Sequence, residues 1–200
     1  YLKPEFYWLD APIGSGRFMR LLNCDRKMGF DRSPEFVKFN QENGINTVLG
    51  DLNNLQYKNE FNLITCLNML FAFDEPETIV RNLVNALKLD GYLILDLLNA
   101  DHENKYQNND DKFYGKIFTQ QEIIKLFNNL DCDVIEIIPH DYWDNKRYYK
   151  FWKSRKFIFK IINWLYFNLN LYPIFNFIET QKRECEFKKY LVVVKKSKVN

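Results

Sequence analysis

The run of residues 6–17 combines an acidic side chain with a glycine turn, because apolar residues lead to Asp10, and Gly14 and Gly16 follow. Glycine has no Cβ and tolerates positive φ, so such a turn lets the backbone approach a ligand closely. A helix that starts directly after the turn presents unpaired N–H groups at the same place. The carboxylate ahead of the glycines suits a cationic end of a ligand, such as an amino group. The run therefore predicts a site for a nucleotide-like cofactor.

Two other nucleotide-binding turns fit this run less well. The dinucleotide fingerprint G-x-G-x-x-G needs a third glycine for close packing of helix on strand, and Met19 stands at that position. The P-loop needs Gly-Lys followed by Ser or Thr, which the run lacks. A nicotinamide-dependent oxidoreductase therefore stays an alternative that Met19 disfavours.

At this point the sequence resembles the class I S-adenosylmethionine-dependent methyltransferases, which carry an acidic residue and then G-x-G-x-G after their first strand. The corresponding run here is Asp10-Ala11-Pro12-Ile13-Gly14-Ser15-Gly16. Pro12 stands where the family usually has its first glycine; proline also suits a tight turn, but it removes one N–H. The resemblance implies S-adenosylmethionine as the cofactor.

Four later runs resemble further parts of the same family in the same order. Residues 28–31 look like the second strand, whose final carboxylate binds both ribose hydroxyls in the family. The turn at 51–52 resembles the one that holds adenine, and the end of the run 61–69 resembles the strand end beside the methionine part of the cofactor. Residues 87–96 resemble the turn into the fifth strand. The cofactor-binding residues that the resemblance implies are Asp10, Ala11, Pro12, Gly14, Gly16, Asp31, Arg32, Ser33, Asp51, Leu52, Leu67 and Asn68.

Strands and helices alternate along residues 6–138 as βαβ units do. Helix starts are predicted at Ser33-Pro34, at 74–77 and at the capping box 119–122. The apolar face of the second of these helices is expected to contain Val80, Leu83, Val84 and Leu87. The sixth and seventh strands are expected at 133–138 and 186–194.

The resemblance implies an α/β fold, with a Rossmann-like seven-stranded, mostly parallel sheet, an antiparallel last strand and helices on both faces. A helical aromatic insertion is expected before the last strand. We expect one methyltransferase domain over residues 1–200, with the cofactor-binding half in 1–99 and the substrate-side half in 100–200.

Residues 141–183 form this insertion, with fourteen aromatic residues between positions 142 and 177 and a basic first part. Read as a helix, residues 153–171 carry one narrow polar stripe, so most of their surface needs a burial partner. The segment 153–178 can pack on its own domain, form a homodimer, roof a pocket for an apolar substrate or lie in a membrane interface. Lysine, asparagine and proline residues interrupt the apolar run that a membrane span needs. Stacking of nucleic-acid bases on the aromatics is a further alternative, which a net charge of +2 does not favour.

Methyl transfer from a sulfonium is an in-line displacement at carbon, for which the protein chiefly aligns the acceptor and the methyl group. An oxygen or carbon acceptor usually loses a proton, and histidine is the commonest base. The candidate catalytic residues are therefore His102, after the fifth strand, and His140, after the sixth.

The run 68–71 lacks the Asn/Asp-Pro-Pro-Tyr/Phe pattern of the branch of the family that methylates adenine and protein amines. The hypothesis is therefore methyl transfer to a small-molecule, sugar or lipid-linked acceptor. The alternative is a catalytically silent partner subunit or membrane-associated scaffold with the same fold.

Composition limits the remaining functions. The four cysteines form no Cys-x-x-Cys pair and only two histidines are present, so no metal site is expected. Reduced thiols and the lack of a signal peptide favour the cytoplasm, with a peripheral contact at a membrane surface as an option. The sequence opens on Tyr1 a few residues before the first strand, where the family usually has a helical segment, so an incomplete N-terminus is expected.

Overall fold

The computed structural model describes residues 3–100, 115–142 and 187–197, with the backbone alone for 141–142 and 187–188. The chain divides into two compact units, of which the first is Tyr1–Pro139 with Lys189–Asn200 and the second is His140–Lys188. Most of the expected aromatic insertion lies outside the described residues, as does His102. None of the helices that the structure describes is long and apolar enough to cross a membrane.

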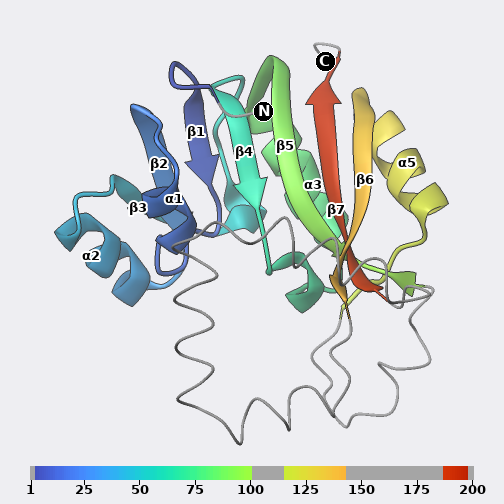
Figure 1. Cartoon of the computed structure of the whole chain (residues 1–200), viewed down its shortest axis with the longest axis horizontal. Coiled ribbons are helices and arrows are strands. Elements are labelled where there is room, and N and C mark those ends of the chain that lie inside the picture. Colours follow the sequence, from blue (N-terminus) through green and yellow to red (C-terminus); the bar gives the residue numbers. More distant parts are fainter. Residues whose placement is uncertain (1–2, 101–114, 143–186, 198–200) are drawn as a thin grey trace, which may run out of the picture. The chain divides into compact units, whose positions relative to one another are not determined.

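Seven strands of the described part form one sheet in the order β3-β2-β1-β4-β5-β7-β6 (Figure 1). Neighbours from β3 to β5 pair in parallel, whereas β7 pairs antiparallel with β5 and runs opposite to β6. The predicted Rossmann-like sheet with an antiparallel last strand is thereby confirmed. The strands are β1 (Tyr7–Asp10), β2 (Arg26–Asp31), β3 (Thr47–Leu49), β4 (Phe61–Cys66), β5 (Leu87–Leu98), β6 (Cys132–Tyr142) and β7 (Phe187–Lys196).

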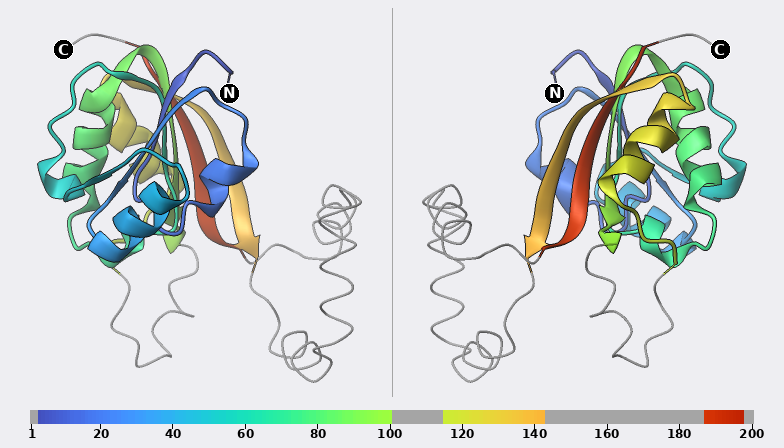
Figure 2. Two further views of the ribbon diagram at one scale, coloured as in Figure 1. Left: turned by 90° about the vertical axis from the view of Figure 1, so that its left-hand side faces the viewer. Right: turned by 90° about the vertical axis from the view of Figure 1, so that its right-hand side faces the viewer.

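Helices cover both faces of the sheet, with α1 on one face and α3 and α5 on the other (Figure 2). The predicted helix starts at α2 and α5 are confirmed, since the side chains of Ser33 and Thr119 each accept a backbone N–H of the first turn. The helical segments are α1 (Arg17–Leu21), α2 (Pro34–Glu42), α3 (Pro76–Ala86) and α5 (Gln120–Asn128), with short 3-10 turns η1 (Leu52–Asn54) and η2 (Leu70–Ala72).

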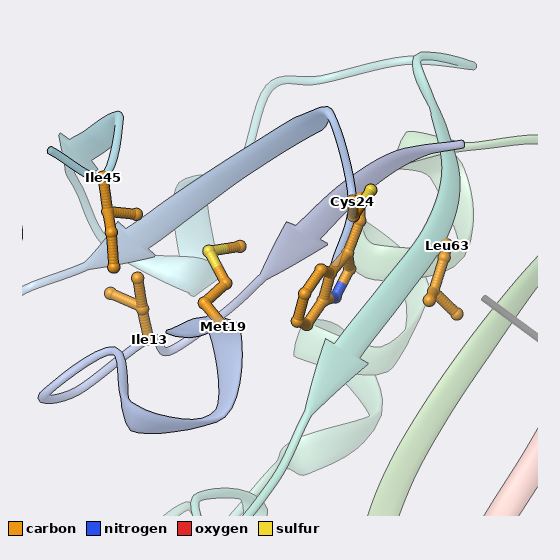
Figure 3. Close-up of a cluster of buried hydrophobic side chains, with 6 residues drawn as sticks. Ile13, Met19, Cys24, Ile45 and Leu63 are labelled. Carbon is orange, nitrogen blue, oxygen red and sulfur yellow. The ribbon is translucent and has the colours of Figure 1, made fainter. Parts of the chain in front are cut away.

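A buried cluster beneath the loop after β1 joins α1 to the strands (Figure 3). Met19 is fully buried there, at the contact where a dinucleotide fingerprint has its third glycine. The cluster consists of Trp8, Ile13, Met19, Cys24, Ile45 and Leu63. A methionine side chain fills this space, so the backbone of the helix does not pack directly on the strand.

Several element boundaries differ from the sequence-based prediction; the seventh strand, for example, was expected at 186–194 and spans Phe187–Lys196. Leu87 was expected on a helix, but it is extended and pairs with Phe61 as the first residue of β5. An apolar residue at the junction fits either pattern, because it is fully buried in both. The sixth strand was expected to end before Pro139, but β6 continues past Pro139 and His140 and ends at Tyr142. Proline is tolerated because β6 is an edge strand, where one missing N–H need not break a ladder.

Candidate active site

The loop after β1 has the backbone geometry that its glycines predicted. Gly14 and Gly16 have φ angles of 52° and 67°, in the left-handed region. The N–H of Gly14 donates to Asp31 Oδ2 at 2.8 Å, and the N–H of Ile13 donates to the carbonyl of Phe30 at 3.0 Å. Both acceptors belong to the end of β2, so the loop is tied to the strand that pairs with β1.

Asp31 also fixes the start of α2. Its Oδ1 accepts the N–H of Ser33 at 2.9 Å, and the hydroxyl of Ser33 in turn accepts the N–H of Phe36. A carboxylate offers about four acceptor positions on its two oxygens. The Gly14 and Ser33 amides use one position on each oxygen, so the buried carboxyl keeps further acceptor capacity. That capacity can be met by two hydroxyl groups of a ligand.

Asn40 on α2, which the sequence analysis did not identify, holds the glycine loop by a side-chain hydrogen bond. This fully buried side chain donates from Nδ2 to the carbonyls of Gly14 and Phe36, at 2.7 and 2.8 Å. Its Oδ1 faces Gly16 so closely that a Cβ on Gly16 would overlap it. The signal that could have identified this residue is an amide placed three residues after the buried Val37, on the apolar face of α2.

Asp10 lies at the end of β1 in a buried hydrogen-bond chain. The indole N–H of Trp8 donates to Thr65 Oγ1 at 2.9 Å, and the Thr65 hydroxyl donates to Asp10 Oδ1 at 2.6 Å. Burial is the largest influence on Asp10, and it raises the pKa of the carboxyl from 3.8 to about 7. The Thr65 hydrogen bond lowers this pKa, and the nearby charge of Asp31 raises it. A buried carboxyl with this pKa favours a cationic neighbour, which restores the ionised form.

The turn after β3 places Asp51 and Leu52 at the same edge of the sheet. Asp51 is exposed, and its Oδ1 accepts from the backbone and side chain of Asn53 at 2.9 and 3.0 Å. Leu52 is buried, and its carbonyl accepts from Asn82 on α3. An open pocket of about 440 Å³ adjoins the turn, with Asp51 and Tyr57 among its lining residues.

The strand end after β4 contains Leu67 and Asn68. Asn68 is exposed and left-handed, with a φ of 57°, and its N–H donates to Asp96 Oδ1 at 2.7 Å. Lys189 on β7 donates to Asn68 Oδ1 at 2.5 Å and pairs with Asp96 Oδ2 at 3.1 Å. The sequence reasoning noted Asp96 only as the end of a strand and passed over Lys189. Strand alternation could have indicated Lys189, because it shares a face with Leu191.

The structure thus brings most predicted cofactor residues to the carboxyl edge of the parallel strands. Ala11 is buried, and its N–H donates to the carbonyl of Thr65. The peptide bond between Ala11 and Pro12 is cis. Arg32 is exposed between Asp31 and Ser33. Of the two candidate bases, His102 lies outside the described residues, and His140 lies within β6 in the second unit. In the described part of the chain, no three acidic, cysteine or histidine side chains gather so that they could hold a metal ion.

The open space above the glycine loop is consistent with an adenosine-type ligand. No described atom lies within 4 Å of the position that a Cβ on Gly14 would take. Two carboxyls belong to this region: Asp31, which binds the Gly14 N–H and has acceptor capacity to spare, and Asp10, whose raised pKa favours a positive charge nearby. These two acceptors therefore fit a ligand that donates from vicinal hydroxyls and from a cationic amino group.

Comparisons with known proteins agree with this geometry. Residues 9–95 match the family model of a methyltransferase domain. An uncharacterized protein of Methanocaldococcus jannaschii is 26% identical over 136 residues, a match that spans 64% of this chain and 64% of that protein. The chain therefore covers somewhat less than two thirds of that relative's length.

Two solved structures share the fold. A putative methyltransferase from Bacillus halodurans has a TM-score of 0.68 at 16% identity, over 98% of this chain and 95% of that chain. A methyltransferase from Thermotoga maritima, described as dependent on S-adenosylmethionine and as a possible histamine N-methyltransferase, has a TM-score of 0.61 at 18% identity, over 98% and 84%. The domain match, the strand order and the glycine loop agree with a class I methyltransferase fold, and S-adenosylmethionine is the cofactor of that family.

Proposed function

We propose that the protein transfers a methyl group from S-adenosylmethionine to a small-molecule, sugar or lipid-linked acceptor. The observation that carries the proposal is the carboxylate of Asp31, which ties the glycine loop to α2 and keeps acceptor capacity on both oxygens. Two backbone N–H groups hold the carboxylate in place before any ligand arrives. Such preorganisation lowers the entropic cost of binding.

Each part of the cofactor has a candidate partner in the proposed site. Asp10 would accept from the amino group of the methionine part, and Asp31 from the two ribose hydroxyls. Asp51 would accept from the adenine amino group, and the N–H of Leu52 would donate to a ring nitrogen. Ala11, Pro12, Gly14 and Gly16 would border the cofactor through their backbone, and Arg32 and Ser33 would flank the ribose, while Leu67 and Asn68 would lie beside the methionine part.

The cofactor supplies an activated methyl group on a sulfonium when it is bound. The chain's own contribution is to hold the acceptor atom in line with the carbon–sulfur bond and to exclude water. The acceptor would supply the lone pair for the new bond, and the electrons of the broken carbon–sulfur bond would stay on sulfur. An acceptor that carries a proton then gives it to a base, for which His102 and His140 are the candidates.

The turn after β4 supports the choice of acceptor class. A left-handed Asn68 is followed there by the 3-10 turn Leu70–Ala72, without the two prolines of the branch that methylates adenine and protein amines. The aromatic segment 153–178 supports an apolar or lipid-linked acceptor, and it would also serve a peripheral membrane contact or a homodimer. A cytoplasmic protein, at times held at a membrane surface, fits this proposal.

A thermal-shift titration with S-adenosylhomocysteine, with NAD in parallel, tests the cofactor site. A ligand that binds only the folded state raises the midpoint as its concentration rises. We expect a shift with S-adenosylhomocysteine alone, and we expect Asp31→Ala to weaken its binding about a hundredfold, because two charge-assisted hydrogen bonds are lost. A shift with neither ligand would favour the catalytically silent scaffold.

The acceptor class is tested with methyl-tritiated S-adenosylmethionine and fractionated cell extract. The proposal expects label in the small-molecule or chloroform-soluble fraction. Label that accumulates in nucleic acid or protein instead would contradict the acceptor class while leaving methyl transfer itself intact. Heat-inactivated protein and Asp31→Ala are the controls.

A further inference from the structure

A buried ion pair joins β5 to β7 at the edge where the proposed site lies, and both of its members bind the turn after β4. Lys189 Nζ and Asp96 Oδ2 are 3.1 Å apart, and the two side chains are only 10% and 2% exposed. Lys189 also donates to Asn68 Oδ1, while Asp96 Oδ1 accepts the N–H of Asn68. The pair thus holds both the backbone and the side chain of one residue.

The strand register explains why these side chains meet. In the antiparallel pairing of β5 with β7, Asp96 is opposite Leu191 and Leu98 is opposite Lys189. Lys189 is therefore the diagonal neighbour of Asp96 on the same face, a spacing that a long side chain bridges. Figure 1 shows that β7 begins at the edge where β4 and β5 end. The lysine ammonium also lies over the ring of Phe71, with Nζ 5.1 Å from the ring centroid.

The pair acts on the turn that leaves β4 rather than on the sheet alone. Asn68 is left-handed, a conformation that asparagine adopts more often than most residues other than glycine. Its two hydrogen bonds to the pair fix this conformation and the direction of the chain from Cys66 onward. The charge of Asp96 also affects Cys66, the last residue of β4. The pKa of the Cys66 thiol is raised by burial first, and then by the charges of Asp96 and Asp10.

We propose that Lys189 is a positioning residue for methyl transfer, which holds the Leu67–Asn68 turn, together with Asp96, against the methionine part of the cofactor. The inference rests on the proposed function, because it assumes that this turn borders the cofactor. Lys189 acts through Asn68 and makes no contact of its own with the reacting atoms. Its removal leaves Asp96 as a buried carboxylate without this cation, and the turn loses one of its two hydrogen bonds to the pair.

A second buried lysine on the same strand provides a matched control. Counted over the whole residue, Lys196 is 6% exposed, compared with 8% for Lys189. Its Nζ donates to Asn59 Oδ1 and to the carbonyls of Val84 and Leu87, at 3.0, 3.1 and 2.9 Å. These acceptors lie around the end of α3, apart from the turn after β4. Replacing either lysine by methionine removes a buried ammonium from β7, but only Lys189→Met loosens Asn68.

The experiment follows S-adenosylmethionine labelled with ¹³C in its methyl group, bound to the full chain. The chemical shift of the bound methyl reports its immediate surroundings, and calorimetry gives the affinity. We expect Lys189→Met to displace the methyl resonance and to weaken binding about tenfold, because the turn is no longer held in place. Lys196→Met is expected to lower the melting temperature while the methyl resonance and the affinity stay as in the wild type.

A second variant covers the case in which Lys189→Met does not fold. Asn68→Gly changes an exposed residue, keeps the left-handed φ available and removes only the side-chain acceptor of Lys189. The proposal expects the methyl resonance to move in this variant too. An unchanged resonance and affinity in Asn68→Gly, or in a folded Lys189→Met, would overturn the inference alone. A wild-type chain that does not bind S-adenosylmethionine would overturn the proposed function and the inference with it.

Discussion

The carboxyl of Asp10 should make the protein less stable in the pH range where the cofactor binds best. Its pKa is about 7 in the folded chain, whereas the ordinary value is 3.8. Between these two values the folded state holds a proton that the unfolded state has released, so the free energy of unfolding falls as pH rises. The fall is complete above about pH 7 and amounts to about 4 kcal/mol for a shift of about 3 units.

Asp10→Asn isolates this contribution. Asparagine has the shape of the protonated carboxyl and can still accept from the Thr65 hydroxyl, but it does not titrate. Urea unfolding of both proteins at pH 5 and pH 8 gives the free energy difference between variant and wild type at each pH. That difference should favour the variant by about 3 kcal/mol more at pH 8, since part of the wild-type loss has already occurred at pH 5.

The same substitution should weaken binding of S-adenosylmethionine. A cationic amino group beside Asp10 favours the ionised carboxyl, so wild-type affinity should rise with pH up to about 7 and then level off. Calorimetry across this range should show that dependence in the wild type and lose it in Asp10→Asn. A stability difference that does not change with pH would refute the assigned pKa, and equal affinities would refute the contact with the amino group.

Two further substitutions test the backbone of the site and of the fold. Gly16→Ala forces a side chain into a left-handed position and onto the Asn40 amide, so it should lower the free energy of unfolding by about 2 kcal/mol or more. Gly44 has a similar φ, but open space surrounds the position of a Cβ there. Chemical denaturation of Gly44→Ala should therefore show a fall of about 1 kcal/mol in the free energy of unfolding. Equal falls in the two variants would contradict the clash with Asn40. Thr119→Ala removes the capping box with Glu122 and should lower the free energy of unfolding by about 1 kcal/mol in the same assay. Thr119→Ser should keep most of that stability. An unchanged stability in Thr119→Ala would contradict the role of the cap.

Local chemistry explains which parts of this protein the sequence predicted. The glycine loop, the Ser33 cap on α2 and the Thr119 capping box each depend on residues within a few positions of one another. Such signals can be read without knowledge of the fold, because the loop depends on the backbone freedom of glycine and the two caps depend on hydrogen bonds that close short rings. The strand order followed from the resemblance rather than from these signals, and pairing confirmed it.

Boundaries and supporting residues depended on contacts that the sequence does not display. Leu87 is apolar whether it ends a helix or begins a strand, and only its pairing with Phe61 decides between them. Pro139 reads as a stop, yet β6 continues past it because the strand lies at an edge. In both cases the neighbour in space determines the conformation of the residue.

The chemistry of the site divides in the same way. The sequence by itself determined that acidic residues follow the first two strands, since Asp10 and Asp31 can be read directly from the chain. Only the tertiary structure decided that Asp10 is buried against a threonine 55 residues away, and that Lys189 pairs with a carboxylate 93 residues away. The physical reason is that pKa and ion pairing depend on burial and on charges nearby in space, which strand pairing sets and local sequence does not.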